Sequence, residues 1–276
     1  MWIITGVFLT VALFEFSAAV GCPPEVAARP CKCKIENKSV LLICANITDE
    51  KVLDGVFRRI SGSLLQSPPS VSNNIVRLIL NNVSFEGDFP WSQLKPLKKL
   101  LLLRITKVPL SNFCVGFKNN VNKNFESLSL RQTRTDSLAD ACFQEFKELR
   151  RISITHNSLT VIKRNWFPTT AKIQVLQFVG NKIERIPEDI FVGMPQLKVF
   201  SVSNNKISKL TESMFSKLKH PLISFKIEDN PLNCDCDLRW IPTVIEKFDV
   251  YGSCTKPDRL KGKRLGQLTS RDFVCH

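Results

Sequence analysis

The chain has very few of the side chains that enzymes use to move protons. Its 276 residues include three His and one Tyr. It also contains no GxSxG, HExxH, GxGxxG or GxxxxGK[ST] string, the common signatures of hydrolases, metalloproteases and nucleotide-binding enzymes. We therefore predict no catalytic residue, no metal and no cofactor, and the sequence indicates a protein that is not an enzyme.

Acidic residues are in the minority. Asp and Glu total 25 against 39 Lys and Arg, which gives a formal net charge of +14 at pH 7 and favours anionic partners or surfaces. Hydrophobic residues make up 43% of the chain and charged residues 23%, so the chain can bury a sizeable core, and a disordered or collagen-like protein is excluded.

Long apolar stretches are absent except at the N-terminus. Residues 1–20 are apolar and end in small residues, with Ser17 and Ala19 placed for signal peptidase cleavage before Val20. The alternative is a buried N-terminal helix, because no base precedes the stretch and Glu15 interrupts it. No other stretch approaches the roughly 20 apolar residues that span a bilayer. We expect a signal peptide over residues 1–19 and a secreted, extracellular protein without a membrane span.

An apolar pattern repeats along most of the chain. Written as LxxLxLxxNxL with other apolar residues allowed, it recurs every 24 or 25 residues, and its best copy is LKVFSVSNNKI, from Leu197 to Ile207. The seven copies begin at Ile75, Leu100, Phe125, Leu149, Ile173, Leu197 and Leu222.

The pattern resembles the leucine-rich repeat. That resemblance implies an α/β solenoid in which each repeat supplies one strand of a curved parallel sheet, and in which the Asn side chain bonds the backbone of the turn after the strand. Four repeats carry this Asn, and the first three replace it with Val83, Val108 and Thr133, so we expect a less regular N-terminal half. The Asn residues are Asn157, Asn181, Asn205 and Asn230.

Ten cysteines cluster mainly at the two ends. The N-terminal group and the string NPLNCDCDLRW resemble the caps of extracellular leucine-rich repeat proteins, and the resemblance implies four disulfides. A zinc site built from the CxC pairs is the less favoured alternative. Cys114 and Cys142 fall on the outer side of adjacent repeats, as a fifth disulfide or as two buried thiols. The implied pairs are Cys22 with Cys33, Cys31 with Cys44, Cys234 with Cys254, and Cys236 with Cys275.

These features divide the chain into four parts: a signal peptide over 1–19, a cysteine-rich N-cap with a connecting helix and loop over 20–74, repeats over 75–233 and a cysteine-rich C-cap over 234–276. The helix is predicted from apolar residues at helical spacing between Val52 and Ile60. This opening resembles secreted arthropod leucine-rich repeat proteins of the luciferase non-catalytic-subunit type. Three N-x-[ST] sequons predict glycans on Asn37, Asn46 and Asn82.

Positions 3, 5 and 7 of each repeat are expected to face outward on the concave sheet. In the first four repeats these positions include four bases and no acid. Arg77, Arg104 and Arg131 step diagonally across adjacent strands, roughly 8 Å apart, which suits successive anionic groups. An ordinary solvated polar face is the alternative. The last three repeats are neutral and partly apolar, which suits a protein ligand. The predicted contacts on this face are Arg77, Arg104, Arg131, Arg151, Gln177 and Lys226.

The C-cap carries a second basic segment, KPDRLKGKR, over residues 256–264. Clustered bases of this kind bind sulfates or phosphates, although a solvated loop is an equal alternative. Nucleic acid is not expected, because few exposed aromatic residues interleave with the bases. The predicted polyanion contacts are Lys256, Arg259, Lys261, Lys263 and Arg264.

Taken together, these patterns predict a secreted binding protein that recognises an extracellular protein on its concave face, with an accessory polyanion contact. Two alternatives remain open. One is an extracellular-matrix protein whose main ligand is a sulfated glycosaminoglycan, and the other is the non-catalytic subunit of a secreted enzyme complex, the role that the luciferase resemblance implies.

Overall fold

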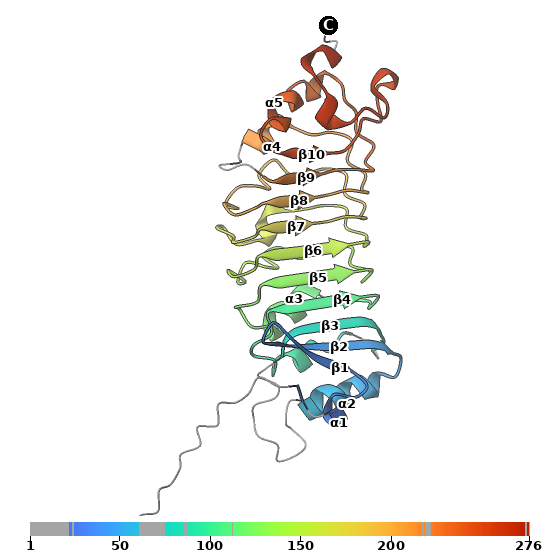
Figure 1. The fold of residues 1–276 in the computed structure, drawn as a ribbon, viewed down its shortest axis with the longest axis vertical. Coiled ribbons are helices and arrows are strands. Elements are labelled where there is room, and N and C mark those ends of the chain that lie inside the picture. Colours follow the sequence, from blue (N-terminus) through green and yellow to red (C-terminus); the bar gives the residue numbers. More distant parts are fainter. Residues whose placement is uncertain are drawn as a thin grey trace, which may run out of the picture.

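The computed structural model describes residues 22–23, 25–60, 75–85, 88–111, 113–216, 218, 222–273 and 275. The predicted signal peptide, residues 1–19, and the Ser- and Pro-rich part of the connecting segment, residues 61–74, lie outside these residues. The described strands form one ten-stranded sheet in chain order (Figure 1). They are β1 Lys32–Glu36, β2 Ser39–Ile47, β3 Ile75–Val83, β4 Leu102–Thr106, β5 Ser127–Arg131, β6 Arg151–Thr155, β7 Val175–Gln177, β8 Val199–Ser201, β9 Ser224–Lys226 and β10 Asp249–Tyr251.

Each predicted repeat supplies one strand, β3 to β9, and each strand pairs in parallel with the next. Side chains at positions 4 and 6 point into the core because successive strand residues face opposite sides of a sheet. In the repeat of β8 these are Phe200 and Val202, both fully buried. The leucine-rich repeat fold predicted from the sequence is confirmed.

The sheet extends beyond the repeats at both ends. In the N-cap, β1 and β2 form an antiparallel hairpin, and β2 pairs in parallel with β3. In the C-cap, β10 pairs in parallel with β9. Both caps therefore bury the open ends of the stack by continuing its backbone hydrogen bonds as well as by covering its apolar side chains.

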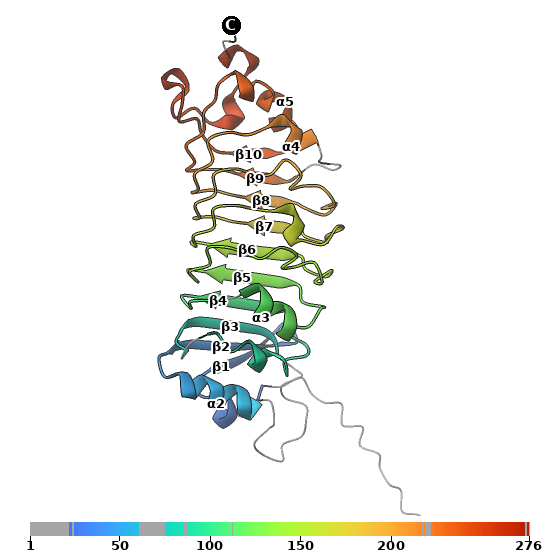
Figure 2. The same ribbon diagram turned by 180° about the vertical axis from the view of Figure 1, so that it is seen from behind.

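Short helices and loops cover the other face of the sheet (Figure 2). The predicted helix before the repeats is α2, whose Leu53 and Val56 are fully buried. Phenylalanine fills much of the space behind the strands, as where Phe117 stacks on Phe113 at 5.1 Å between ring centroids. The helices are α1 Glu25–Ala28, α2 Glu50–Ile60, α3 Phe113–Asn120, α4 Glu212–Ser216 and α5 Ile241–Ile245, with 3₁₀ helices at Trp91–Leu94, Arg164–Trp166, Cys236–Leu238, Asp258–Leu260, Leu265–Gln267 and Ser270–Asp272. Within the described residues, no helix combines the length and apolar character that crossing a membrane requires.

The asparagines at position 9 of the repeats form a ladder of hydrogen bonds through the stack. Asn205 accepts a hydrogen bond from the backbone N–H of Ile183 in the preceding repeat at 3.0 Å. Its amide donates to the carbonyl oxygens of Phe178 and Val202, both at 2.9 Å. Asn181 and Asn230 make equivalent bonds, and so satisfy backbone groups that the turns would otherwise leave unpaired.

Where Thr133 replaces the asparagine, a backbone carbonyl takes its place. Leu110 occupies the same turn position as Ile183, whose N–H bonds an asparagine of the next repeat. The Leu110 N–H instead donates to the backbone carbonyl oxygen of Thr133 at 2.9 Å. Thr133 itself donates through its N–H to Asn157 at 2.8 Å. The strands of this half are longer than those of the C-terminal half: β4 has five residues and β8 has three.

A ladder of left-handed residues turns the chain at the end of each strand. Position 8 of every repeat has a positive φ, including His156 at 54° and Gly180 at 69°. At Gly180 an added Cβ would lie 3.3 Å from the backbone nitrogen of His156, so glycine lets the turn of this repeat pack closely against the turn of the preceding one. The other members are Asn82, Lys107, Gln132, Asn204 and Asp229.

All ten cysteines are paired. The structure joins Cys22 to Cys33, Cys31 to Cys44, Cys234 to Cys254 and Cys236 to Cys275, the pairs that the cap resemblance implies. It also joins Cys114 in α3 to Cys142 of the next repeat, with 5.1 Å between their Cα atoms. In the part of the chain that the structure describes, no three His, Cys, Asp or Glu side chains are grouped to hold a metal ion.

Candidate functional site

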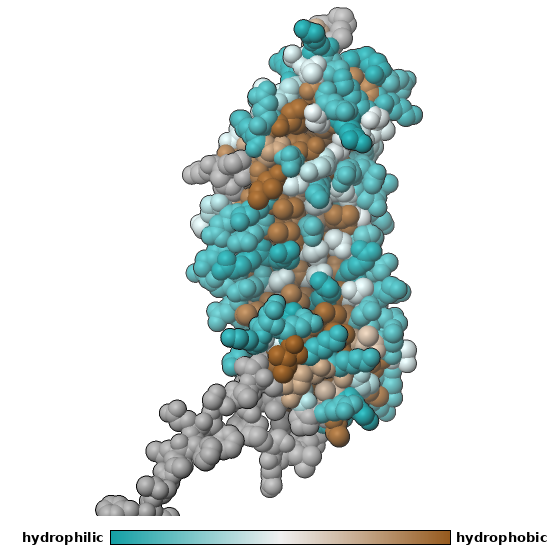
Figure 3. Space-filling model, in the orientation of Figure 1, coloured by the Kyte–Doolittle hydropathy of each residue, from teal (hydrophilic) through white to brown (hydrophobic). Residues whose placement is uncertain are grey.

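Side chains at positions 3, 5 and 7 line one broad face of the sheet, which we call the concave face. The strand register aligns these positions in rows, so that Arg104 lies beside Ile79 of β3 and Ser129 of β5. Figure 3 looks onto this face and shows apolar side chains in both halves, with polar side chains on either side of them. In the first four repeats, the exposed side chains at positions 3, 5 and 7 are Arg104, Arg131 and Arg151.

One member of the predicted arginine diagonal is engaged within the protein. Arg77 donates through Nη1 to Glu36 Oε2 at 3.0 Å and through Nη2 to the Glu36 carbonyl oxygen at 3.2 Å. Glu36 lies in the β1–β2 hairpin, 41 residues earlier in the sequence, and no repeat pattern reveals that contact. Arg77 therefore ties the N-cap to the first repeat.

The other basic side chains of this face reach solvent. Arg104 and Arg151 are exposed and have no ion-pair partner among the described residues. Arg131 donates to His156 Nδ1 at 2.8 Å. Because arginine can only donate, His156 must present Nδ1 as a neutral acceptor. Partial burial, and then the charge of Arg131, lower the pKa of His156, so the imidazole stays neutral at pH 7.

On β7 and β8, in the C-terminal half of the concave face, positions 3, 5 and 7 carry no charged residue. Val175, Gln177, Val179 and Val199 are partly exposed on adjacent strands. The serines expected to face outward there are instead shielded by their larger neighbours: Ser201, Ser203 and Ser224 are 3%, 8% and 8% exposed. On β7 and β8 the accessible side chains are therefore valine and glutamine, whereas the last repeat exposes Lys226 and Glu228.

The concave face ends in a polar hollow of about 790 Å³ against the C-cap. Its lining includes Glu228, Tyr251 and Arg264. Lys226 Nζ lies 5.3 Å from the centre of the Tyr251 ring, and the Tyr251 hydroxyl donates to Asp249 at 3.3 Å. The negative charge of Asp249 raises the pKa of Tyr251. This end of the face thus mixes both signs of charge.

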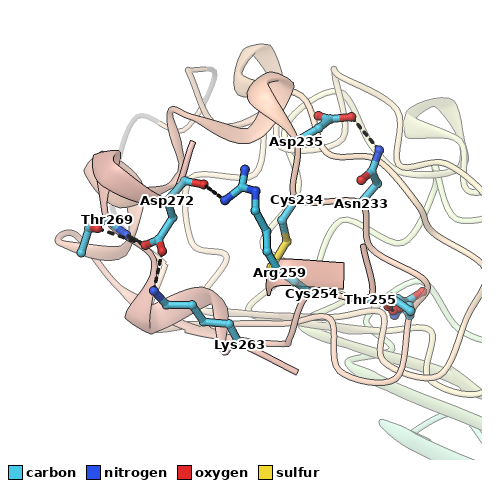
Figure 4. Close-up of a disulfide and its surroundings, with 10 residues drawn as sticks. Asn233, Cys234, Asp235, Cys254, Thr255, Arg259, Lys263, Thr269 and Asp272 are labelled. Carbon is cyan, nitrogen blue, oxygen red and sulfur yellow. Dashed lines mark hydrogen bonds and ion pairs between the residues drawn. A yellow bond between two sulfur atoms is a disulfide. The ribbon is translucent and has the colours of Figure 1, made fainter. Parts of the chain in front are cut away.

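Two of the five bases predicted to bind polyanions form hydrogen bonds to Asp272 within the C-cap (Figure 4). Lys263 Nζ donates to Asp272 Oδ1 at 2.6 Å, and Arg259 donates to the carbonyl oxygen of Asp272. The Lys263 hydrogen bond, reinforced by the Thr269 N–H, lowers the pKa of Asp272. The three remaining bases of this segment are exposed: Lys256, Lys261 and Arg264.

The three sequon asparagines are exposed at the N-terminal end of the stack. Asn37 has a φ of 50° in the turn between β1 and β2. Asn46 and Asn82 stand on adjacent strands, where Asn82 Nδ2 donates to Asn46 Oδ1 at 3.0 Å. Glycans at these positions would crowd the first strands and leave the C-terminal half of the concave face open.

Comparison with known families identifies two regions. The BspA type leucine-rich repeat region matches in six copies over residues 116–234, and the leucine-rich repeat C-terminal domain matches over residues 254–276. A solved octameric complex of latrophilin 3, Unc5D and the leucine-rich repeat part of FLRT2 matches with a TM-score of 0.47 and 19% identity, over 71% of this chain and 76% of that chain.

Curated relatives share part of the chain. Leucine-rich repeat and fibronectin type-III domain-containing protein 2 of Mus musculus is 28% identical over 104 residues, which is 38% of this chain and 11% of that protein. Protein 4 of the same series from Rattus norvegicus is 24% identical over 146 residues, which is 50% of this chain and 23% of that protein. The chain thus spans less than a quarter of the length of these relatives. With the fold described above, the two family matches show that the chain is a leucine-rich repeat protein with a leucine-rich repeat C-terminal domain and disulfides at both ends.

Proposed function

We propose that the chain is a secreted, non-enzymatic binding protein that holds an extracellular protein ligand on the C-terminal half of its concave face. The observation that carries this proposal is the partly exposed set Val175, Gln177, Val179 and Val199, which crosses adjacent strands without a charge. Apolar area depleted of charge is typical of the centre of a protein interface. The exposed Arg151, which pairs in register with Val175, would form part of its polar rim.

A photo-crosslinking experiment tests this proposal. The photoreactive residue p-benzoylphenylalanine replaces Val199 on the concave face, or Val192, which is 44% exposed away from the strands, as the matched control. Exposure to extracellular fluid and light should give a discrete protein adduct at position 199 and none at position 192. Equal labelling at the two positions would show non-specific contact and reject the concave face as the docking surface.

Polyanion binding is the accessory function that we propose, because Arg104 and Arg151 are exposed and have no ion-pair partner among the described residues. Changing Arg104 and Arg151 to Ser should weaken binding to immobilised heparin without lowering the melting temperature, since exposed charges carry little folding energy. The companion variant is Lys261→Ser with Arg264→Ser, because Lys263 is tied to Asp272. If only this companion elutes at lower salt, the concave arginines are a solvated face.

A role as the non-catalytic subunit of a secreted enzyme complex, and the similarity to luciferase subunits that suggested it, stay predictions. Affinity capture of the intact chain followed by mass spectrometry would test them. A catalytic protein that co-purifies in fixed ratio would support this role, and its absence from repeated captures would reject it.

A further inference from the structure

A second basic surface lies on the flank formed by the turns that follow the strands. An open hollow of about 750 Å³ occurs there, and its lining contains four bases and one acid. The bases come in two pairs, one base of each pair from each of two adjacent repeats. Lys182 and Lys206 both occupy position 10, and Arg185 and Lys209 both occupy position 13. The lining is Thr160, Lys182, Glu184, Arg185, Lys206, Ser208 and Lys209.

The backbone places these pairs in register. Lys182 N–H donates to the Leu159 carbonyl oxygen, and Lys206 N–H donates to the Ile183 carbonyl oxygen, each at 2.8 Å and each to the preceding repeat. Adjacent layers joined by such bonds lie roughly 5 Å apart. Lys182 and Lys206 therefore project from neighbouring layers at the same point of the turn.

The backbone pairing of these layers continues into the C-cap. Asn233 N–H donates to the Ser208 carbonyl oxygen at 2.9 Å, and Asn233 forms a parallel bridge with Lys256. Ser208, Asn233 and Lys256 thus occupy three successive layers on one side of the molecule. Lys256 begins the basic segment KPDRLKGKR, so the bases of the repeats and those of the cap lie along one direction.

The charges of this flank are available to a ligand. Lys182, Arg185 and Lys206 are exposed and make no ion pair within the described parts of the chain. Lys209 lies 3.7 Å from Asp237, and the two side chains are 68% and 75% exposed. Solvent weakens a pair of this kind, so an incoming anion can replace Asp237 at little cost.

We propose that the basic flank, defined as Lys182, Arg185, Lys206, Lys209 and Lys256, binds a linear sulfated polysaccharide that runs along the stacking direction. A chain with repeated sulfates can meet the paired bases of two adjacent layers and then Lys256 two layers further on. The hydroxyls of Thr160 and Ser208 add hydrogen-bond donors. The lining contains no aromatic residue for base stacking, so single-stranded nucleic acid fits less well.

This inference deepens the proposed accessory polyanion contact, on which it rests through Lys256. It also separates the two ligands in space. The flank follows the strand ends, whereas the proposed protein ligand lies on the strands themselves. Polysaccharide and protein could therefore bind at the same time.

The test measures fluorescence anisotropy of a fluorescein-labelled heparin oligosaccharide across a series of NaCl concentrations. The flank variant carries Lys182→Ser and Lys206→Ser. The charge-matched control carries Lys95→Ser and Lys98→Ser, two exposed lysines of the first repeat. We expect the flank variant to bind roughly three- to tenfold more weakly. Its salt slope should fall by roughly two, one for each lost contact, and the control should change less than about twofold. Equal weakening of both variants, or no weakening of the flank variant, would overturn the proposal.

Two further measurements make the result specific. Asp237→Asn removes the acid beside Lys209, so binding should strengthen about twofold. An unchanged or weaker affinity would contradict a sulfate beside Lys209. An oligothymidine probe of equal charge should bind more weakly than the heparin oligosaccharide, and tighter binding would reject the polysaccharide assignment in favour of nucleic acid. Crosslinking at position 199 is read independently, so failure of the protein-binding proposal and failure of the flank remain distinguishable.

Discussion

The asparagine ladder offers a direct test of how the stack is held together, and Asn205→Ala is the perturbation. Asn205 is 4% exposed. The carbonyl oxygens that it contacts each keep another donor: Asn181 also donates to Phe178 at 3.1 Å, and Asn230 also donates to Val202 at 3.0 Å. The Ile183 N–H instead has Asn205 as its partner, at 3.0 Å, inside a residue that is fully buried.

The magnitude follows from that asymmetry. A buried N–H left without an acceptor costs about 1–3 kcal/mol, and each hydrogen bond that is lost without orphaning its partner costs about 0.5–1.5 kcal/mol. We expect Asn205→Ala to lower the free energy of unfolding by about 3 kcal/mol. The control is Asn204→Gly, because Asn204 is exposed and its φ of 54° suits glycine.

Guanidinium chloride unfolding followed by tryptophan fluorescence measures the difference, and amide hydrogen exchange at Ile183 localises it. Exchange at Ile183 should accelerate in Asn205→Ala and not in Asn204→Gly. A loss of less than about 1 kcal/mol, or one equal to that of the control, would refute the claim that the asparagine satisfies the turn.

Three further substitutions test other contacts. Gly116→Ala should destabilise the protein by about 2 kcal/mol although alanine favours helices, because its Cβ would overlap the Trp91 ring. A raised melting temperature would contradict this packing. Arg164→Lys should lower the free energy of unfolding, measured by denaturant titration, by about 2 kcal/mol. The Arg164 guanidinium donates to the backbone carbonyls of residues 167–169 and 192, and a single ammonium cannot replace all of these hydrogen bonds. An unchanged unfolding midpoint would show that these bonds do not stabilise the fold. Arg131→Gln should raise the pKa of His156, measured by NMR titration, because it removes the neighbouring positive charge. The folded protein loses stability as pH falls from the unfolded-state pKa of about 6.5 toward the lower folded-state pKa, and this loss should become smaller in the variant. An unchanged pKa would rule out the coupling between Arg131 and His156.

The sequence predicted the repeating part of the fold because that part is governed by local spacing. Core positions such as Phe200 and the asparagines recur at fixed intervals, and their burial follows from the alternation of side chains along a strand. The cap hairpin and β10 were missed as strands of the same sheet, since neither carries the repeat pattern and only the register of the stack brings them to its ends.

Contacts between distant segments could not be read from the repeat pattern. The Arg77–Glu36 and Lys263–Asp272 ion pairs join residues outside any repeat relation, so two residues predicted to bind ligands are engaged inside the protein. The basic flank was also missed, although reading positions 10 and 13 in the same way as positions 3, 5 and 7 would have aligned Lys182 with Lys206. Its extension to the C-cap depends on the bridge at Asn233, which no spacing indicates.

The most direct test of a protein ligand on the concave face is the effect of one charge placed in its apolar part. Val199→Asp introduces a carboxylate on the concave face, and Val192→Asp introduces the same group on an exposed site away from the strands. Each variant is immobilised, and the retention of the protein that crosslinks at position 199 is measured by quantitative mass spectrometry. Val199→Asp should lose that protein by at least about tenfold while Val192→Asp retains it, because burying an unpaired carboxylate in an interface is costly. Retention by Val199→Asp equal to that of the unmodified chain would contradict the account.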